Sequence, residues 1–177
     1  DFIGQTAGTW PASANWGYPA TVGTGSEVIG IKAGNVGGAL SIATGGTNGN
    51  SAYQSAGLHW NGTRNFYYIA NFQIDIITTL KFEAGMVDSI TTDGAVNAKA
   101  TPTFHMTTGA VVIFDTSDDT NISFITAVGG VVGANVDHTQ VSLAAATDII
   151  VEIVGSDGTA TGYVNGIPFP GGGGAIT

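Results

Sequence analysis

Residues Ile149 to Val164 read IIVEIVGSDGTATGYV, and this stretch decides the fold. Its first half is rich in β-branched residues, which favour strands. The centre, Ser156-Asp157-Gly158, contains an Asp-Gly pair, which tolerates the positive φ angles of a tight hairpin turn. The second half, Thr159 to Val164, alternates small and larger residues like a returning strand. The stretch therefore predicts a β-hairpin.

Two earlier segments alternate apolar and polar residues with a period of two, which indicates half-buried strands. The apolar positions are Phe72, Ile74 and Ile76 in the first segment and Phe82, Ala84 and Met86 in the second. Further on, the run Val111 to Phe114 leads into an acidic loop, and residues 122–126 are expected to form the returning strand.

Helices are not expected, because the only candidate is one alanine-rich turn at residues 143–147. Short strands at intervals of about 8 to 12 residues are typical of a sandwich or barrel. We therefore predict an all-β protein, an antiparallel β-sandwich of the jelly-roll form.

The chain is expected to divide into an N-terminal arm, residues 1–26, and a β-sandwich domain, residues 27–177. The arm shows little alternation yet holds too many aromatic residues for a flexible linker. We expect it to pack on its own sandwich or on a neighbouring subunit. The expected contact residues are Phe2, Ile3, Trp10, Trp16 and Tyr18. Residues 171–177 are expected to form a loop whose following strand is missing.

The composition of the chain argues against two classes of partner, nucleic acids and membranes. Thirteen acidic residues against four basic ones give a net charge of −9, which is the wrong sign for binding nucleic acid. No apolar run is long enough for a membrane-spanning helix, so no membrane partner is expected. Charged residues make up only 10% of the chain and 28 of its 177 residues are glycine, which predicts a neutral, polar surface.

The acidic loop is the candidate metal site. Oxygen ligands for calcium are offered by Asp115, Asp118, Asp119 and Asn121. The alternative, which we favour, is a solvated hairpin turn whose Asp and Asn side chains bond their own backbone. No other cofactor is expected, and the three histidines, His59, His105 and His138, are expected at the surface or rim rather than as ligands.

Aromatic residues near the first predicted strand are candidates for stacking on sugar rings, namely Trp60, Tyr67 and Tyr68. Packing at a subunit contact is the favoured alternative. A glycosidase would need two or three carboxylates at alternate positions of one strand. The best strand offers Asp75 alone, so no catalytic residues are assigned.

Five segments resemble the concanavalin-A-like (laminin-G-like) jelly rolls found in structural proteins of tailed bacteriophages. The resemblance covers roughly residues 37 to 169. The segments are GGALSIATGG (37–46), YIANFQIDI (68–76), LKFEAGMVDS (80–89), VVIFDTSDDTNISFITAVGG (111–130) and TDIIVEIVGSDGTATGYVNGIPF (147–169).

The resemblance implies a non-enzymatic virion protein, a capsid decoration or cement protein on the particle surface. Its implied partners are copies of itself, expected as a homotrimer, and the major capsid protein or another virion protein. The alternative is a glycan-binding, lectin-like module of a tail or head fibre that recognises the host surface.

Overall fold

The structure is a computed structural model that describes residues 8–9, 20–22, 28–31, 40–43, 52–54, 61–91 and 93–177. All of its regular elements are β-strands, and none of the described residues is helical. Among these residues there is accordingly no helix long and apolar enough to cross a membrane. The predicted all-β class is confirmed, and the chain divides into two compact units, Asp1–His59 and Trp60–Thr177.

The first unit contains two small antiparallel sheets. One has the order β1-β3-β4 and the other pairs β2 with β5. The strands are β1 (Gly8–Thr9), β2 (Ala20–Val22), β3 (Val28–Ile31), β4 (Leu40–Ala43) and β5 (Ala52–Gln54). The domain boundary expected near residue 26 lies within this unit, at residues outside the described part of the chain.

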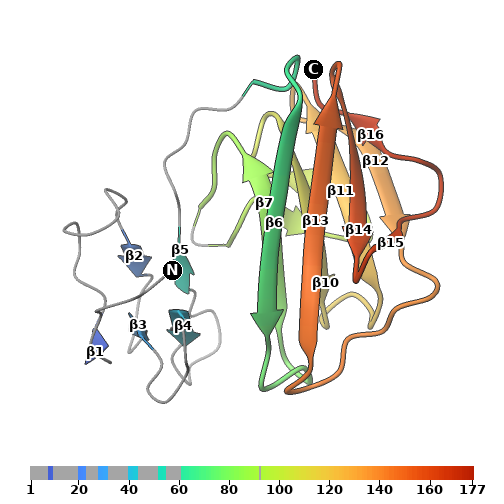
Figure 1. Ribbon diagram of the computed structural model, residues 1–177. Helices are drawn as coiled ribbons and strands as arrows, with labels where there is room; N and C mark the ends of the chain where they lie inside the picture. Colours follow the sequence, from blue (N-terminus) through green and yellow to red (C-terminus); the bar gives the residue numbers. More distant parts are fainter. Residues whose placement is uncertain are drawn as a thin grey trace. The chain divides into compact units, whose positions relative to one another are not determined.

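The second unit is an antiparallel β-sandwich (Figure 1). Its front sheet has the order β15-β14-β13-β6, with β16 also paired to β14, and its back sheet has the order β12-β11-β10-β7. The front strands are β6 (Phe66–Gln73), β13 (Asp148–Ser156), β14 (Thr159–Val164), β15 (Ile167–Pro168) and β16 (Gly174–Ala175). The back strands are β7 (Lys81–Val87), β10 (Gly109–Asp115), β11 (Ile122–Val128) and β12 (Val131–Asp137).

The predicted hairpin is confirmed as β13 and β14, which pair from Ser156 opposite Thr159 to Val151 opposite Val164. Asp157 and Gly158 take φ angles of 49° and 81° at the turn, as the Asp-Gly pair predicted. Alternate residues of β13 point into the sandwich and are buried. They meet Val112, Phe114 and Phe124 of the back sheet in the main core.

The back sheet is apolar on both faces. Every residue of β10 is buried, and Val111 and Ile113 point away from the main core into a second one. That second core is closed by residues from 88–91 and 93–108, which contain β8 (Val96–Ala98) and β9 (Thr103–Phe104). We call residues 88–108 the covering segment.

Two glycines on the inner face of the front sheet make room for aromatic rings. A Cβ at Gly155 would lie 2.0 Å from Cε1 of Phe66, and one at Gly162 would lie 2.5 Å from Cδ2 of Phe124. Any other residue there would force the ring to move. The glycine content of the strands thus serves packing between the two layers.

Two expectations were wrong in detail. The strand expected to include Ile74 and Ile76 ends at Gln73, and Ile76 is 66% exposed in the following loop. The C-terminal segment is not a bare loop, because β16 pairs with β14 and Ile176 is fully buried in the main core. The glycine-rich sequence around Ile176 indicated a loop, but the Ile176 side chain packs in the main core.

Candidate functional site

The outer face of the front sheet carries exposed apolar side chains. The exposed fractions are 58% for Tyr67, 55% for Ile69, 37% for Ile150 and 39% for Val154. Tyr67 lies directly opposite Val154 in the pairing of β6 with β13. We call these four residues the outer apolar face.

This face follows from the sequence of the two strands. In β13 the β-branched run fills both sets of alternating positions, so one set enters the core while Ile150 and Val154 remain outside. In β6, Phe66, Tyr68 and Phe72 are the residues that pack against the core. A front sheet with a polar outer face would carry Thr or Ser at these outer positions.

Glu152 lies at the middle of the outer apolar face, opposite Ile69 on one side and Tyr163 on the other. The hydroxyl of Tyr67 donates a hydrogen bond to its Oε2 over 2.5 Å. This bond, together with desolvation and the negative charge of Glu152, raises the pKa of Tyr67. The contact holds the Tyr67 ring across the two strands.

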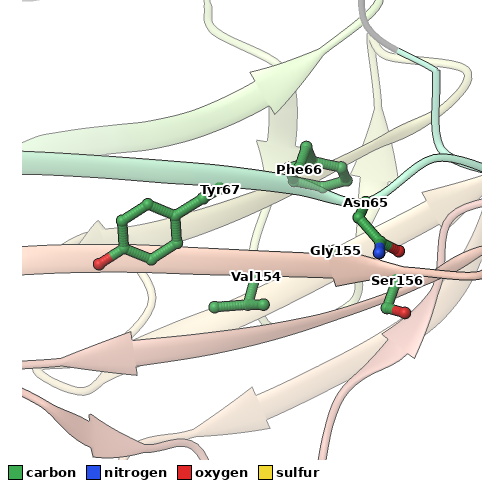
Figure 2. A pocket seen from close by; sticks show the side chains of 6 residues that line it. All are labelled: Asn65, Phe66, Tyr67, Val154, Gly155 and Ser156. Carbon is green, nitrogen blue, oxygen red and sulfur yellow. The ribbon is translucent and has the colours of Figure 1, made fainter.

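A shallow depression of about 480 Å³ lies at one end of this face (Figure 2). It is lined by Asn65, Phe66, Tyr67, Val154, Gly155 and Ser156. Figure 2 shows the Tyr67 ring extending from β6 towards β13, with the Asn65 and Ser156 side chains at the other end. An exposed ring beside amide and hydroxyl groups can both stack and hydrogen-bond a polar ligand.

The acidic loop that was considered as a candidate calcium site binds a lysine instead. Asp118 Oδ2 accepts hydrogen bonds from the backbone N–H groups of Lys99 and Ala100, over 2.8 Å and 2.9 Å. The Lys99 ammonium forms an ion pair with Asp119 and donates to the backbone oxygen of Asn121 over 3.0 Å. The Lys99 side chain is 1% exposed, so the loop binds a buried cation from the covering segment.

The remaining ligands proposed for calcium are bonded locally. Asp115 Oδ1 accepts from the backbone N–H and the hydroxyl of Ser117, as in the turn favoured from the sequence. Asn121 donates to Asp137 over 3.2 Å. Burial opposes ionisation of Asp119, but hydrogen bonds from Lys99 and from the Asn121 backbone, with the charge of Lys99, lower its pKa overall.

No group of three or more His, Asp and Glu side chains converges as a metal site within the described part of the chain.

His138 is 5% exposed, which differs from the surface position expected for it. Its Nδ1 accepts from the backbone N–H groups of Gln140 and Val141, and its ring packs edge-on against Phe169 at 4.9 Å. His138 is therefore a buried histidine that is hydrogen-bonded to neighbouring backbone groups.

The structure separates the aromatic candidates for glycan binding. Tyr67 lies on the outer face, whereas Tyr68 points into the sandwich, where desolvation raises its pKa to about 12. Trp60 lies outside the described residues. So do the expected arm contacts Phe2, Ile3, Trp10, Trp16 and Tyr18.

Sequence analysis did not find Lys99 or Glu152 as structural partners. Lys99 could have been identified from the charge balance. The chain has four basic residues, so few side chains can neutralise the negative charge of the acidic loop. The signal for Glu152 was a single carboxylate within a β-branched strand.

Comparison of the chain with protein-family models, with curated proteins and with solved structures gives no match.

Proposed function

We propose that this chain is a non-catalytic adhesion module that attaches to another protein surface through the outer apolar face. The supporting observation is that this face exposes four large side chains, while the outer face of β10 and β11 in the back sheet is closed by the chain itself. Contiguous exposed apolar surface of this kind is typical of protein interaction sites.

The low charge of the face supports the same proposal. Among the residues of β6 and the central part of β13, Glu152 is the one carboxylate, and its Oε2 accepts the Tyr67 hydroxyl. Cores of protein interfaces are depleted in charge and enriched in tyrosine. A surface of this composition is suited to contact with protein.

We propose the surface of a phage particle as the setting. The segments that resemble jelly rolls of tailed-bacteriophage structural proteins support it, with the major capsid protein or another virion protein as the partner. The neutral, glycine-rich composition is compatible with close contact between many copies on a shell. In this proposal the arm residues, Phe2 to Tyr18, add contacts to the same particle.

The test is co-sedimentation of the purified chain with phage particles that lack it. The variant Ile150→Asp/Val154→Asp places two charges in the outer apolar face, and we expect binding to fall about tenfold or more. Val131→Asp is the matched control, because Val131 is 68% exposed on β12 of the other sheet. Equal binding by both variants, with unchanged circular dichroism, would contradict the proposal.

A glycan-binding module is the second candidate, and the depression beside Tyr67 favours it. A Tyr67 ring 58% exposed and bordered by Asn65 and Ser156 offers a stacking surface with hydrogen-bonding groups. A glycan array tests this candidate directly. Selective binding lost in Tyr67→Ala or Trp60→Ala, and kept in Val131→Ala, would support it, whereas a blank array would exclude it for the glycans printed.

A further inference from the structure

Strand β6 forms one edge of the front sheet (Figure 1). It pairs with β13 without a register shift over eight residues, from Phe66 opposite Gly155 to Gln73 opposite Asp148. Within the described part of the chain, no backbone hydrogen bond is made to the other side of Tyr67–Gln73. Alternate N–H and C=O groups of Tyr67–Gln73 therefore face outwards with no described strand beside them.

The other edges of the sandwich carry the features by which proteins block edge pairing. Strand β7 of the back sheet bears Lys81 and Glu83. Strand β12 contains a register shift at Gly133, and a Cβ on this glycine would lie 2.5 Å from the backbone oxygen of Ala175. Strand β15 has two residues, one of them Pro168. Charge, bulges, proline and short length all discourage a further strand.

Strand β6 has none of these protections. Its sequence, FYYIANFQ, contains no charged residue and no proline, and its register has no bulge. This is notable in a chain with a net charge of −9, where most self-contacts would bring carboxylates together. Among the described edges of the sandwich, β6 is the open one, and two copies would not repel each other along it.

We infer that β6 pairs antiparallel with β6 of a second copy of this chain, about a two-fold axis at Ile69. Directly opposed residues in an antiparallel pair point to the same face. The axis therefore sets Ile69 against the second copy's Ile69 and Tyr67 against the second copy's Asn71. On the inner side, Phe72 lies opposite the second copy's Phe66, so both faces continue across the junction.

A second copy fits this edge better than an open-ended series of strands. Two-fold pairing uses the same edge from both partners and leaves neither free, so the assembly closes at two. The outer apolar faces of both copies then join into one surface on the merged sheet. The inference is independent of what that surface binds, and it gives a dimer rather than the homotrimer expected from the resemblance.

Sedimentation velocity of the full chain, at increasing concentration, tests the inference. We expect a dimer for the native chain and a dissociation constant about tenfold or more higher for Ile69→Lys, because two ammonium groups would meet at the axis. Ile69 is 55% exposed, so the substitution leaves the core of each copy intact. A native chain that stays monomeric at the highest concentration overturns the inference.

Two control variants locate the contact. Ile150→Lys alters the outer face of β13, one strand in from the edge, and Val131→Lys alters β12. Both should remain dimeric. If Ile150→Lys dissociates the dimer as strongly as Ile69→Lys, the copies meet face to face and edge pairing is wrong. A trimer unaffected by Ile69→Lys also overturns it.

Cross-linking gives a positive test, because the chain has no cysteine. Opposed residues in an antiparallel pair have Cα atoms about 4.5–5.5 Å apart, which lies within the roughly 4.4–6.8 Å range of disulfides. Ile69→Cys treated with diamide should therefore form a covalent dimer, while Val131→Cys should not. Equal cross-linking of both variants, or none for Ile69→Cys, counts against pairing at this axis.

Discussion

Both sheets of the sandwich carry β-branched apolar residues on their outer faces. On β10 of the back sheet these side chains are buried, whereas on the front sheet they are exposed. On the back sheet, Val111 and Ile113 are 2% and 0% exposed, because the covering segment closes over them. On the front sheet, Ile69 and Ile150 are 55% and 37% exposed. Alternation of apolar residues therefore marks which side chains share a face, but the rest of the chain decides whether that face is buried. The uncovered face is the one available to a partner.

Polar anchors hold the cover in place. Glu83 on β7 accepts hydrogen bonds from the backbone N–H groups of Ala95 and Val96, over 2.6 Å and 3.1 Å. Lys81 donates to the backbone oxygens of Asp93 and Val96. The acidic loop binds Lys99, near the middle of the covering segment. The front sheet has no equivalent anchors on its outer face among the described residues.

The sharpest test of this contrast compares one isoleucine from each face. Ile113→Ala should lower the free energy of unfolding by about 2–5 kcal/mol, because it removes a buried side chain from the second core. Ile150→Ala should lower it by less than about 1 kcal/mol. Urea denaturation of both variants gives the comparison. Equal losses would mean that the front face is covered in solution.

A second test weakens the cover at its buried lysine. Lys99→Met keeps most of the side-chain volume but removes the ammonium bonded to Asp119 and to the Asn121 carbonyl. We expect a loss of about 1.5–3 kcal/mol in urea denaturation, the range for hydrogen bonds to a charged group. Asp93→Asn, at an exposed residue of the covering segment, serves as the control. A Lys99→Met variant as stable as the native chain would show that the ammonium does not anchor the cover.

A third and smaller effect concerns pH. Burial raises the pKa of Glu83 above its usual value of 4.5, partly offset by the hydrogen bonds from Ala95 and Val96 and by Lys81. A carboxyl with a raised folded-state pKa contributes stability at low pH that is lost as the pH rises through that value. Relative to Glu83→Gln, the native chain should therefore lose stability as the pH rises from 4.5 towards neutrality.

The lowered pKa of Asp119 acts in the opposite direction, since its contribution is lost as the pH falls. Asp119 is present in both chains and cancels in the difference between them. Thermal unfolding at a series of pH values measures that difference. Parallel curves for the native chain and Glu83→Gln would rule out the assigned burial of Glu83.

Sequence alone predicted the strands whose patterns are local. The hairpin of β13 and β14, the alternating strand β7 and the return of β10 into β11 were all confirmed. Their signals, alternation and an Asp-Gly turn, are encoded within about twenty residues. The antiparallel sandwich followed from them, while the jelly-roll connectivity stays a prediction.

The covering segment and the outer apolar face could not be predicted in this way. Residues 88–108 have short strands and are held mainly by side-chain bonds from Glu83, Lys81 and the acidic loop, which neither alternation nor a turn motif signals. Exposure of Ile69 depends on the absence of a similar cover over the front sheet. The same long-range contact explains why the acidic loop suggested calcium, since its cation comes from Lys99, about twenty residues earlier.

Because the chain has few basic residues, digestion with trypsin can report on the opening of the covering segment. Trypsin cuts after lysine and arginine, and the chain has four such residues. Two of them, Lys81 and Lys99, hold the covering segment, and Lys99 is almost wholly enclosed. Fragments ending at Lys99 would therefore appear when the covering segment opens, so a digestion time course records how often this part of the molecule opens.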